Sequence, residues 1–223
     1  MYDALYATCD LVDASDLRVL LIRGAGGAFA AGTDISQFRE FRSGDDGIAY
    51  ERRLDRVIDR LEAVRPITIA AIDGVAAGGG CAISLACDLR ICSTRAQFGV
   101  PIAKTLGNCL SAANTARLVE MIGVARAKEL LLTGRLMDAN EAMALGLVTR
   151  LVSTERIDQE ASAFAEELCA CAPSTVRASK AMLARLRASR PLVDADDIVG
   201  ACYASNDFRE GVSAFLEKRK PRW

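Results

Sequence analysis

The 223-residue sequence contains no histidine, and this absence excludes several catalytic devices at once. Catalysis by a Ser-His or Cys-His pair, zinc sites built on histidine and histidine general bases all need the missing side chain. The eight cysteines form no C-x-x-C pair, and most of them stand among alanine, leucine and isoleucine. This pattern is typical of reduced thiols in a core. We therefore expect no metal site.

The sequence also lacks a charge excess and a membrane segment. Its 28 basic and 29 acidic residues leave a net charge of −1, which argues against nucleic acid as the main partner. No secretory hydrophobic segment precedes the first element, so we expect a cytoplasmic location. The longest apolar run, residues 67–87, contains Asp73 and several glycines. It has no flanks typical of an anchor, so we interpret it as a buried turn and expect no membrane partner.

Strand and helix patterns alternate in the first two thirds of the chain. Strands are predicted at residues 17–23, 67–72, 88–93 and 148–152. Helices are predicted at residues 2–14, 47–64, 81–86, 111–122, 125–132, 138–145 and through most of the chain from 157 onward. The sequence therefore predicts an α/β core over residues 1–150, followed by a helical region over 151–223.

Three consecutive glycines, Gly78-Gly79-Gly80, separate a predicted buried strand from a predicted buried helix. Glycine lets another backbone or a ligand approach closely, so tight packing of strand against helix is one interpretation. The N–H groups at a helix N-terminus also favour negative charge, so binding of an anion or a developing oxyanion is the other. The triplet alone does not choose between them.

The glycine-rich loops do not fit the nucleotide-binding motifs. After the first strand, Gly24 and Gly26 fit G-x-G-x-x-G, but Phe29 stands where a small residue is needed. In a Walker loop starting at Gly74, Gly80 would replace the lysine that reaches the phosphates. Each nucleotide interpretation therefore fails at a residue that its chemistry requires.

Two glycine loops follow two predicted strands, AFAAGTDISQF at residues 28–38 and GVAAGGGCA at residues 74–82. If the strands share a sheet, both loops leave it at the same end. One backbone N–H from each loop can then point at a single carbonyl oxygen. Such an oxyanion hole is worth about 3–4 kcal/mol per donor.

These segments resemble the enoyl-CoA hydratase/isomerase (crotonase) superfamily, and the matching pieces follow its order along nearly the whole chain. They are AFAAGTD, GVAAGGGCAISLACDLRICS, AQFGVP, LTGR, DANEAMALGLVTRLV and FREGVSAFLEKRKPRW. The resemblance implies an α/β fold, a spiral of ββα units with C-terminal helices. It also implies assembly as a homotrimer or hexamer, with residues 151–223 as the trimerisation region.

The resemblance assigns an acyl-CoA site to the two loops. The N–H groups of Thr33 and Gly79 would bind the thioester carbonyl and stabilise its enolate. The substrate groove would comprise Ala31, Gly32, Thr33, Asp34, Ile35, Ser36, Gly78 and Gly79. Coenzyme A enters as part of the substrate, and no separate cofactor is implied.

Two positions depart from the hydratase pattern. The residue three places after Gly79 is normally glutamate and here is Ala82, and the residue after the proline of FGVPI is Ile102. General acid–base groups typically contribute 10²- to 10⁴-fold each, so the loss makes ordinary hydration doubtful. The resemblance therefore implies an acyl-CoA enzyme of the lyase, isomerase or hydrolase type that acts through an enolate, and a non-catalytic acyl-CoA-binding or oligomerisation protein is the alternative.

The segment KTLGNCLS, residues 104–111, supplies the remaining polar candidates for the acyl pocket: Asn108, Cys109 and Ser111. The alternative is a helix N-terminus capped by asparagine and serine. For Asp34 we favour structuring of the loop, or a position at the edge of the coenzyme A site, over proton transfer. The resemblance also implies a β-hairpin ahead of the first helix, and the sequence opens at that helix. We interpret this opening as a truncation or an internal start.

Overall fold

The computed structural model describes residues 1–189 and 193–223. The strands are β1 (Val19–Arg23), β2 (Ile67–Ile72), β3 (Val75–Ala77), β4 (Leu89–Ser93), β5 (Gln97–Gly99), β6 (Met137–Asp138) and β7 (Arg150–Val152). The α-helices are α1 (Tyr2–Asp13), α2 (Gly44–Glu62), α3 (Gly79–Ala86), α4 (Ile102–Thr105), α5 (Ala112–Thr133), α6 (Ala139–Ala144), α7 (Ile157–Cys169), α8 (Pro173–Ala188), α9 (Asp196–Ala204) and α10 (Asn206–Leu216). Two 3-10 helices are η1 (Ile35–Glu40) and η2 (Thr154–Arg156).

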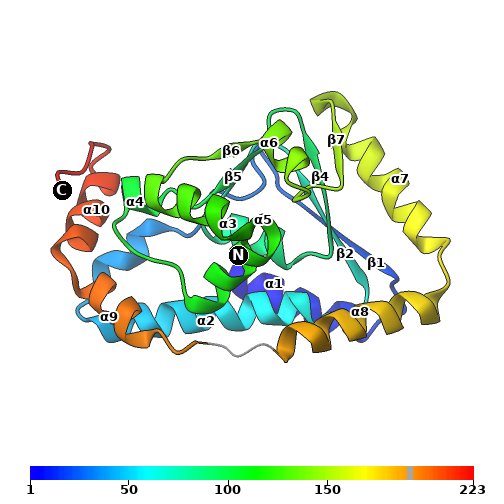
Figure 1. Cartoon of the computed structure of the whole chain (residues 1–223), viewed down its shortest axis with the longest axis horizontal. Coiled ribbons are helices and arrows are strands. Elements are labelled where there is room, and N and C mark those ends of the chain that lie inside the picture. Colours follow the sequence, from blue (N-terminus) through cyan, green and yellow to red (C-terminus); the bar gives the residue numbers. More distant parts are fainter. Residues whose placement is uncertain (190–192) are drawn as a thin grey trace.

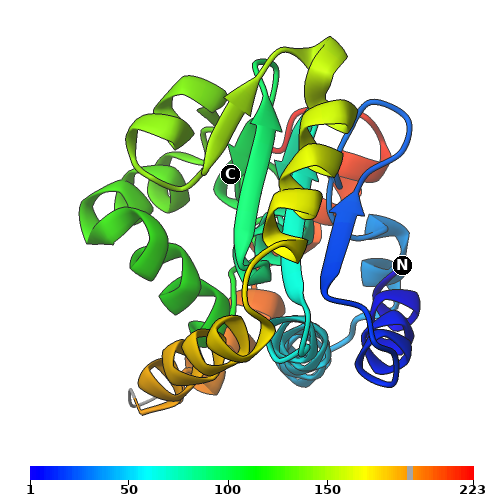
Figure 2. The ribbon, with the colours of Figure 1, turned by 90° about the vertical axis from the view of Figure 1, so that its right-hand side faces the viewer.

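The larger sheet is parallel, with strand order β1-β2-β4-β7, and α7 lies across one of its faces (Figure 2). Successive residues of a strand point to opposite faces. On β2, Ile69 packs with Phe164 of α7, whereas Ile72 joins the main core on the other face, together with Leu61 of α2 and Leu85 of α3. Both faces are covered, and every residue of β2 is buried, as its continuous apolar run predicts.

A smaller sheet has the order β3-β5-β6 and stands next to the first. The chain passes from β2 to β3 and then into α3, and from β4 to β5 and then into α4. Each of these ββα turns gives one strand to each sheet, so the chain advances as a spiral. The strands of the smaller sheet have only two or three residues, which is too short for periodicity to reveal, and the sequence analysis did not predict them.

The predicted strands of the larger sheet and the predicted helices are confirmed, with small differences at their ends. Gly123 breaks α5 into two helical pieces because it adopts φ 77° and ψ 159°. Gly134 ends the same helix in the left-handed conformation that glycine adopts at little cost. Within residues 1–189 and 193–223, no helix combines the length and the apolar character needed to cross a membrane.

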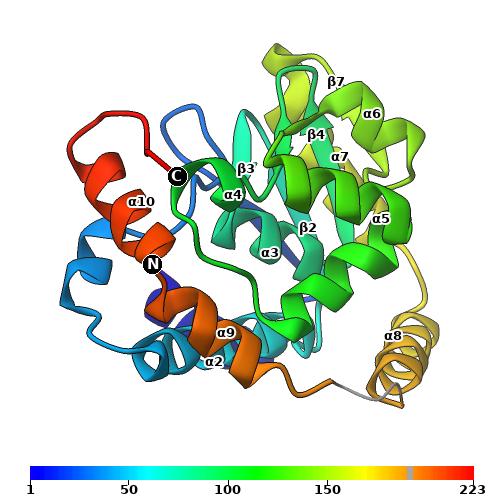
Figure 3. The ribbon, with the colours of Figure 1, turned by 60° about the vertical axis from the view of Figure 1, so that its left-hand side comes forward.

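The C-terminal helices take two different positions. α9 lies along α2, and α10 packs against η1, so both border the same side of the core (Figures 1 and 3). α8 has no buried residue, although Lys180 is held by Asp88 and by the carbonyl of Pro66. Met182, Leu183 and Leu186 of α8 are 59–67% exposed. These apolar side chains have no cover within the described part of the monomer.

Candidate active site

The two glycine loops meet at the C-terminal end of adjacent strands. β1 and β2 pair in parallel, and beyond them Ala77 N–H donates to the carbonyl of Ala30 at 2.9 Å. A Cβ added to Gly80 would lie 2.0 Å from that same carbonyl oxygen. Only a residue without a side chain therefore lets α3 begin directly against the first loop. This contact supports the packing interpretation for the third glycine of the triplet.

Of the other two glycines, Gly78 donates its N–H to the carbonyl of Gly99 at 3.0 Å. Gly78 adopts a positive φ of 54°, and a Cβ built on it would come within 4.0 Å of Gly32 Cα, so the two loops touch. Across residues 1–189 and 193–223, neither Thr33 N–H nor Gly79 N–H donates to a protein acceptor. Gly79 is also the first residue of α3, where the helix dipole favours negative charge.

Three hydroxyl groups gather beside these donors. Tyr2 Oη and Thr33 Oγ1 are 2.9 Å apart, and Thr33 Oγ1 also hydrogen-bonds Tyr50 Oη. A Cβ on Gly79 would lie 1.9 Å from Tyr2 Oη, so the phenol rests directly on this glycine. Burial raises the pKa of both tyrosines above its usual value. They therefore stay protonated and can donate hydrogen bonds.

A cavity of about 690 Å³ opens between the loops and the C-terminal helices. Six of the eight residues expected in the groove line it: Ala31, Gly32, Thr33, Ile35, Gly78 and Gly79. Asp34 and Ser36 are exposed and do not line it. The Asp34 carboxylate accepts from Ser36 N–H at 3.0 Å and caps η1. Hydrogen bonding to the side chain of Ser36, and then to its N–H, lowers the pKa of Asp34. Asp34 thus orders the start of η1, which is one of the two roles favoured for it.

The two positions at which the resemblance implies glutamate differ in their surroundings. Ala82 is 4% exposed within the main core and is not in the cavity wall. Ile102 lines the cavity, alongside Val100 and Leu110. This part of the wall is therefore apolar and offers no group that could activate water.

The polar candidates of segment 104–111 lie in three different places. Asn108 lines the cavity, and its Nδ2 donates to Tyr203 Oη at 3.0 Å. Cys109 packs at the edge of a cluster of aromatic side chains, and its contact with Cys202 raises the pKa of its thiol. Ser111 caps α5 by accepting from Asn114 N–H at 3.1 Å. The capping interpretation is therefore confirmed for Ser111, which does not line this cavity.

The carboxylate in the cavity wall was not predicted from the sequence. Glu51 of α2 is 4% exposed, accepts from Tyr203 Oη at 2.6 Å and from Ser111 N–H at 3.0 Å, and lines the cavity. Burial raises its pKa to about 7 against the opposing effect of these hydrogen bonds. The signal was present, because Glu51 falls at helical spacing between the apolar residues Ile48 and Leu54. A carboxylate on the apolar side of a helix is expected to be buried and to have hydrogen-bond partners there.

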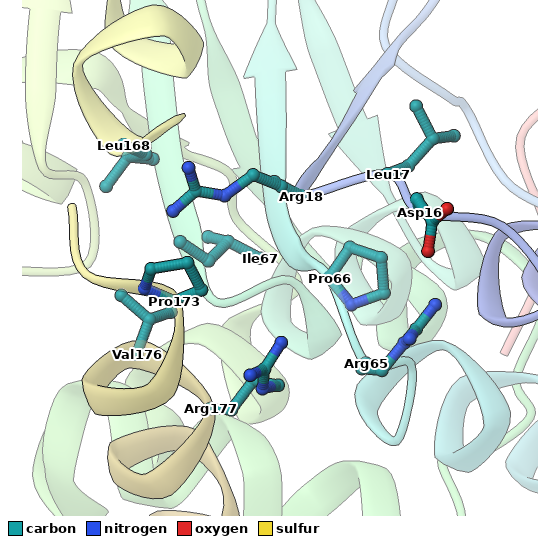
Figure 4. A pocket seen from close by; sticks show the side chains of 10 residues that line it. All are labelled: Asp16, Leu17, Arg18, Arg65, Pro66, Ile67, Leu168, Pro173, Val176 and Arg177. Atoms are coloured by element: carbon teal, nitrogen blue, oxygen red, sulfur yellow. The ribbon is translucent and has the colours of Figure 1, made fainter. Parts of the chain in front are cut away.

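A different cavity lies at the opposite end of the strands, where three arginines surround Pro66 and Pro173 (Figure 4). Arg18 donates to the carbonyls of Cys169 and Cys171, and Arg65 donates to those of Asp13 and Ser15. Arg18 therefore joins the segment before β1 to the end of α7, and Arg65 joins the segment before β2 to the end of α1. In the described residues, no group of three or more cysteine, aspartate or glutamate side chains is arranged to hold a metal ion.

The spiral of ββα turns and the loop-lined cavity at the strand ends define the crotonase class of α/β proteins. The family model described as enoyl-CoA hydratase/isomerase matches residues 2–223. The chain belongs to this family, whose members act on acyl-CoA.

Individual relatives agree with this assignment. The probable enoyl-CoA hydratase echA8 of Mycobacterium bovis is 36% identical over 226 residues, covering 100% of this chain and 86% of that protein. Human mitochondrial enoyl-CoA hydratase domain-containing protein 2 is 38% identical over 230 residues, which cover 99% of this chain and 78% of the human protein. The crystal structure of an enoyl-CoA hydratase/carnitine racemase from Magnetospirillum magneticum has a TM-score of 0.80 at 36% identity, covering 100% and 85%.

Proposed function

We propose that this protein binds an acyl-CoA thioester and stabilises its enolate with two main-chain donors, the N–H groups of Thr33 and Gly79. The observation that carries the proposal is that both donors lack a protein acceptor while both residues line one cavity. An enolate oxygen placed between them would gain two charge-assisted hydrogen bonds at the N-terminus of α3. The apolar wall around Ile102 suits an acyl chain.

The proposed reaction is a lyase or isomerase step that passes through this enolate. Ordinary hydration needs carboxylates to activate water, and Ala82 and Ile102 supply none. The same loss favours, as the second candidate, a protein that binds acyl-CoA without turning it over. We also propose a cytoplasmic location. We propose that the protein uses no cofactor beyond the coenzyme A of its substrate.

Co-crystals with butyryl-CoA test the oxyanion hole directly. The thioester oxygen is expected within about 3 Å of both Thr33 N and Gly79 N. The carbonyl carbon of ¹³C-labelled butyryl-CoA is also expected to shift downfield on binding, since hydrogen bonds polarise it. A thioester oxygen that contacts neither N–H, with an unshifted carbon, would end the assignment.

Crotonyl-CoA tests the missing carboxylates. We expect little hydration by the natural sequence, and at least about a tenfold increase in Ile102→Glu, because position 102 faces the cavity. Ile102→Gln is the matched control, since it adds a polar group of similar size that cannot accept a proton. Rapid hydration by the natural sequence would contradict the reading of Ala82 and Ile102.

We propose a homotrimer or hexamer as the working assembly, with the C-terminal helices at the interface. The exposed Met182, Leu183 and Leu186 of α8 support this, because a second copy would remove them from water. Light scattering behind a sizing column is expected to give three or six times the mass of the 23.8 kDa chain. A monomer at micromolar concentration would contradict the proposal.

A further inference from the structure

Glu51 lies in a wall shared by two cavities. On one side is the acyl cavity described above. On the other is a cavity of about 510 Å³, which α2, the start of α5 and the start of α9 enclose. Its polar lining consists of Arg52, Asp55, Ser111, Asp194 and Asp196. Asp194 is exposed, so this second cavity connects the inner face of α2 with solvent.

We infer that Glu51 is the proton-transfer residue of the acyl cavity and that it exchanges its proton with solvent through the second cavity. The inference rests on the proposed function, which supplies the enolate. In the step, a Glu51 carboxylate oxygen takes a proton from the α-carbon of the thioester. The C–H electron pair becomes the enolate double bond, and the negative charge passes to the oxygen held by the two N–H groups. Return of a proton from the Glu51 carboxylic acid restores the thioester.

The hydrogen bonds of Glu51 leave room for this transfer. A carboxylate offers about four lone-pair sites, and the protein uses one on each oxygen, through Tyr203 Oη and Ser111 N–H. The two donors fix the orientation of the carboxyl group, and the remaining sites can receive a proton. Tyr203 is itself 2% exposed, and its ring packs against Phe208 with the ring centroids 4.7 Å apart.

Asn108 extends this chain of polar groups along the cavity wall. Its Nδ2 donates to Tyr203 Oη, but its Oδ1 is buried and has no hydrogen-bond partner among the described residues. Figure 3 shows the segment between α4 and α5 passing close to α9, which brings Asn108 to Tyr203. A buried acceptor without a partner costs free energy unless something binds it. A polar group of the bound substrate would supply that partner next to Glu51.

The surroundings of Glu51 hold it near the midpoint of its titration at neutral pH. Burial raises its pKa to about 7, and the nearby Asp55 carboxylate contributes in the same direction. The titratable groups that interact with it are Tyr2 of α1, Tyr50 and Asp55 of α2, Cys109, and Cys202 and Tyr203 of α9. A group with this pKa both accepts and returns a proton at physiological pH.

Deuterium exchange at the α-carbon tests the inference. Butyryl-CoA is incubated with the protein in D₂O, and incorporation of deuterium is followed by mass spectrometry. We expect exchange that rises with pH through an inflection near pH 7, and a loss of at least about 100-fold in Glu51→Gln. Asp45→Asn, which removes an exposed carboxylate from the same helix, is the matched control and should exchange like the natural sequence.

Binding separates this inference from the function on which it rests. If ¹³C-labelled butyryl-CoA binds and its carbonyl shifts, but Glu51→Gln exchanges at the natural rate, the assignment of Glu51 is wrong and the oxyanion hole stands. Binding and a shifted carbonyl without any exchange in the natural sequence would overturn it in the same way. If the natural sequence neither binds nor polarises the thioester, both proposals fail.

Tyr203→Phe provides a second test that does not depend on the folding of Glu51→Gln. The Tyr203 hydroxyl stabilises the charged form of Glu51 and so lowers its pKa. Its removal should move the inflection of the exchange profile to higher pH, whereas a merely structural role of Glu51 predicts no such movement. An unmoved inflection in a folded Tyr203→Phe variant would assign the titration to another group and overturn the inference.

Discussion

The two ends of the cavity differ in whether the main chain or the side chains supply the polar groups proposed to act on the substrate. At the glycine loops, the donors proposed for the thioester oxygen are main-chain N–H groups, and the loops are joined by hydrogen bonds such as Ala77 N–H to the Ala30 carbonyl. At the α2–α9 end, the polar groups are the side chains of Glu51, Asn108 and Tyr203. Main-chain donors cannot titrate and are positioned by the fold itself. Side chains can move protons, but each depends on partners from distant segments.

The largest loss of stability is expected where the main-chain segments of the two glycine loops meet. Gly80→Ala would place a methyl group 2.0 Å from the carbonyl oxygen of Ala30, and neither backbone can yield without separating the loops. We expect the free energy of unfolding to fall by about 3 kcal/mol and acyl-CoA binding to be lost. Urea unfolding and calorimetry measure the two effects.

Gly26→Ala is the control for that substitution. Gly26 has a positive φ of 75°, which Gly80 does not, but no heavy atom lies within 4 Å of an added Cβ. Its cost is therefore limited to the left-handed backbone, about 1–2 kcal/mol, and acyl-CoA binding should persist. Equal losses in the two variants would show that close approach of the loops is not what Gly80 provides.

At the α2–α9 end of the cavity, Glu51 should make the free energy of unfolding depend on pH. The pKa of Glu51 is raised from 4.5 to about 7 on folding, so the folded state binds more protons than the unfolded state between these values. Stability therefore falls as pH rises from about 4.5 to about 7, by roughly 3 kcal/mol for this group. In Glu51→Gln this decline should disappear, so the variant gains relative to the natural sequence at pH 8. Urea unfolding at several pH values measures the difference, and parallel curves for the two proteins would contradict the assignment.

A smaller loss is expected for Tyr203→Phe. The substitution keeps the ring among its aromatic neighbours but leaves Glu51 Oε1 and Asn108 Nδ2 without their shared partner. We expect a loss of about 1–3 kcal/mol at pH 8, where Glu51 is ionised, and a smaller loss at pH 5, where it is protonated. Thermal unfolding at both pH values checks this, and a loss independent of pH would separate Tyr203 from the titration of Glu51.

The smallest effect is expected for Asp34→Ala. Its carboxylate is exposed and caps only the short helix η1. The melting temperature should fall by roughly 2 °C, and the affinity for butyryl-CoA should change less than about twofold. Asp34→Asn, which keeps a capping oxygen, should restore the melting temperature. A large loss of affinity in both variants would instead place Asp34 at the edge of the coenzyme A site.

The glycine-loop end of the cavity could be predicted from the sequence more fully than the α2–α9 end. The strand at residues 67–72, the glycine triplet and the helix after it are neighbours in sequence, so their contacts follow from local pattern. The short strands β3, β5 and β6 left no such pattern, and they were missed. Among the polar candidates, Asn108 lines the cavity and Ser111 does not, a distinction that depends on how the segment between α4 and α5 turns.

The spiral followed only from the resemblance to the family. The sequence by itself determined the strands of the larger sheet, the pair of glycine loops and the apolar residues Ala82 and Ile102. Each of these is written within a short segment, where backbone preferences and residue identity suffice. Only the tertiary structure decided that Glu51 reaches the cavity and shares a hydrogen bond with Tyr203, 152 residues further along the chain. Such a contact depends on the packing of α9 along α2. Burial, which sets the pKa of Glu51, exists only once that packing is complete.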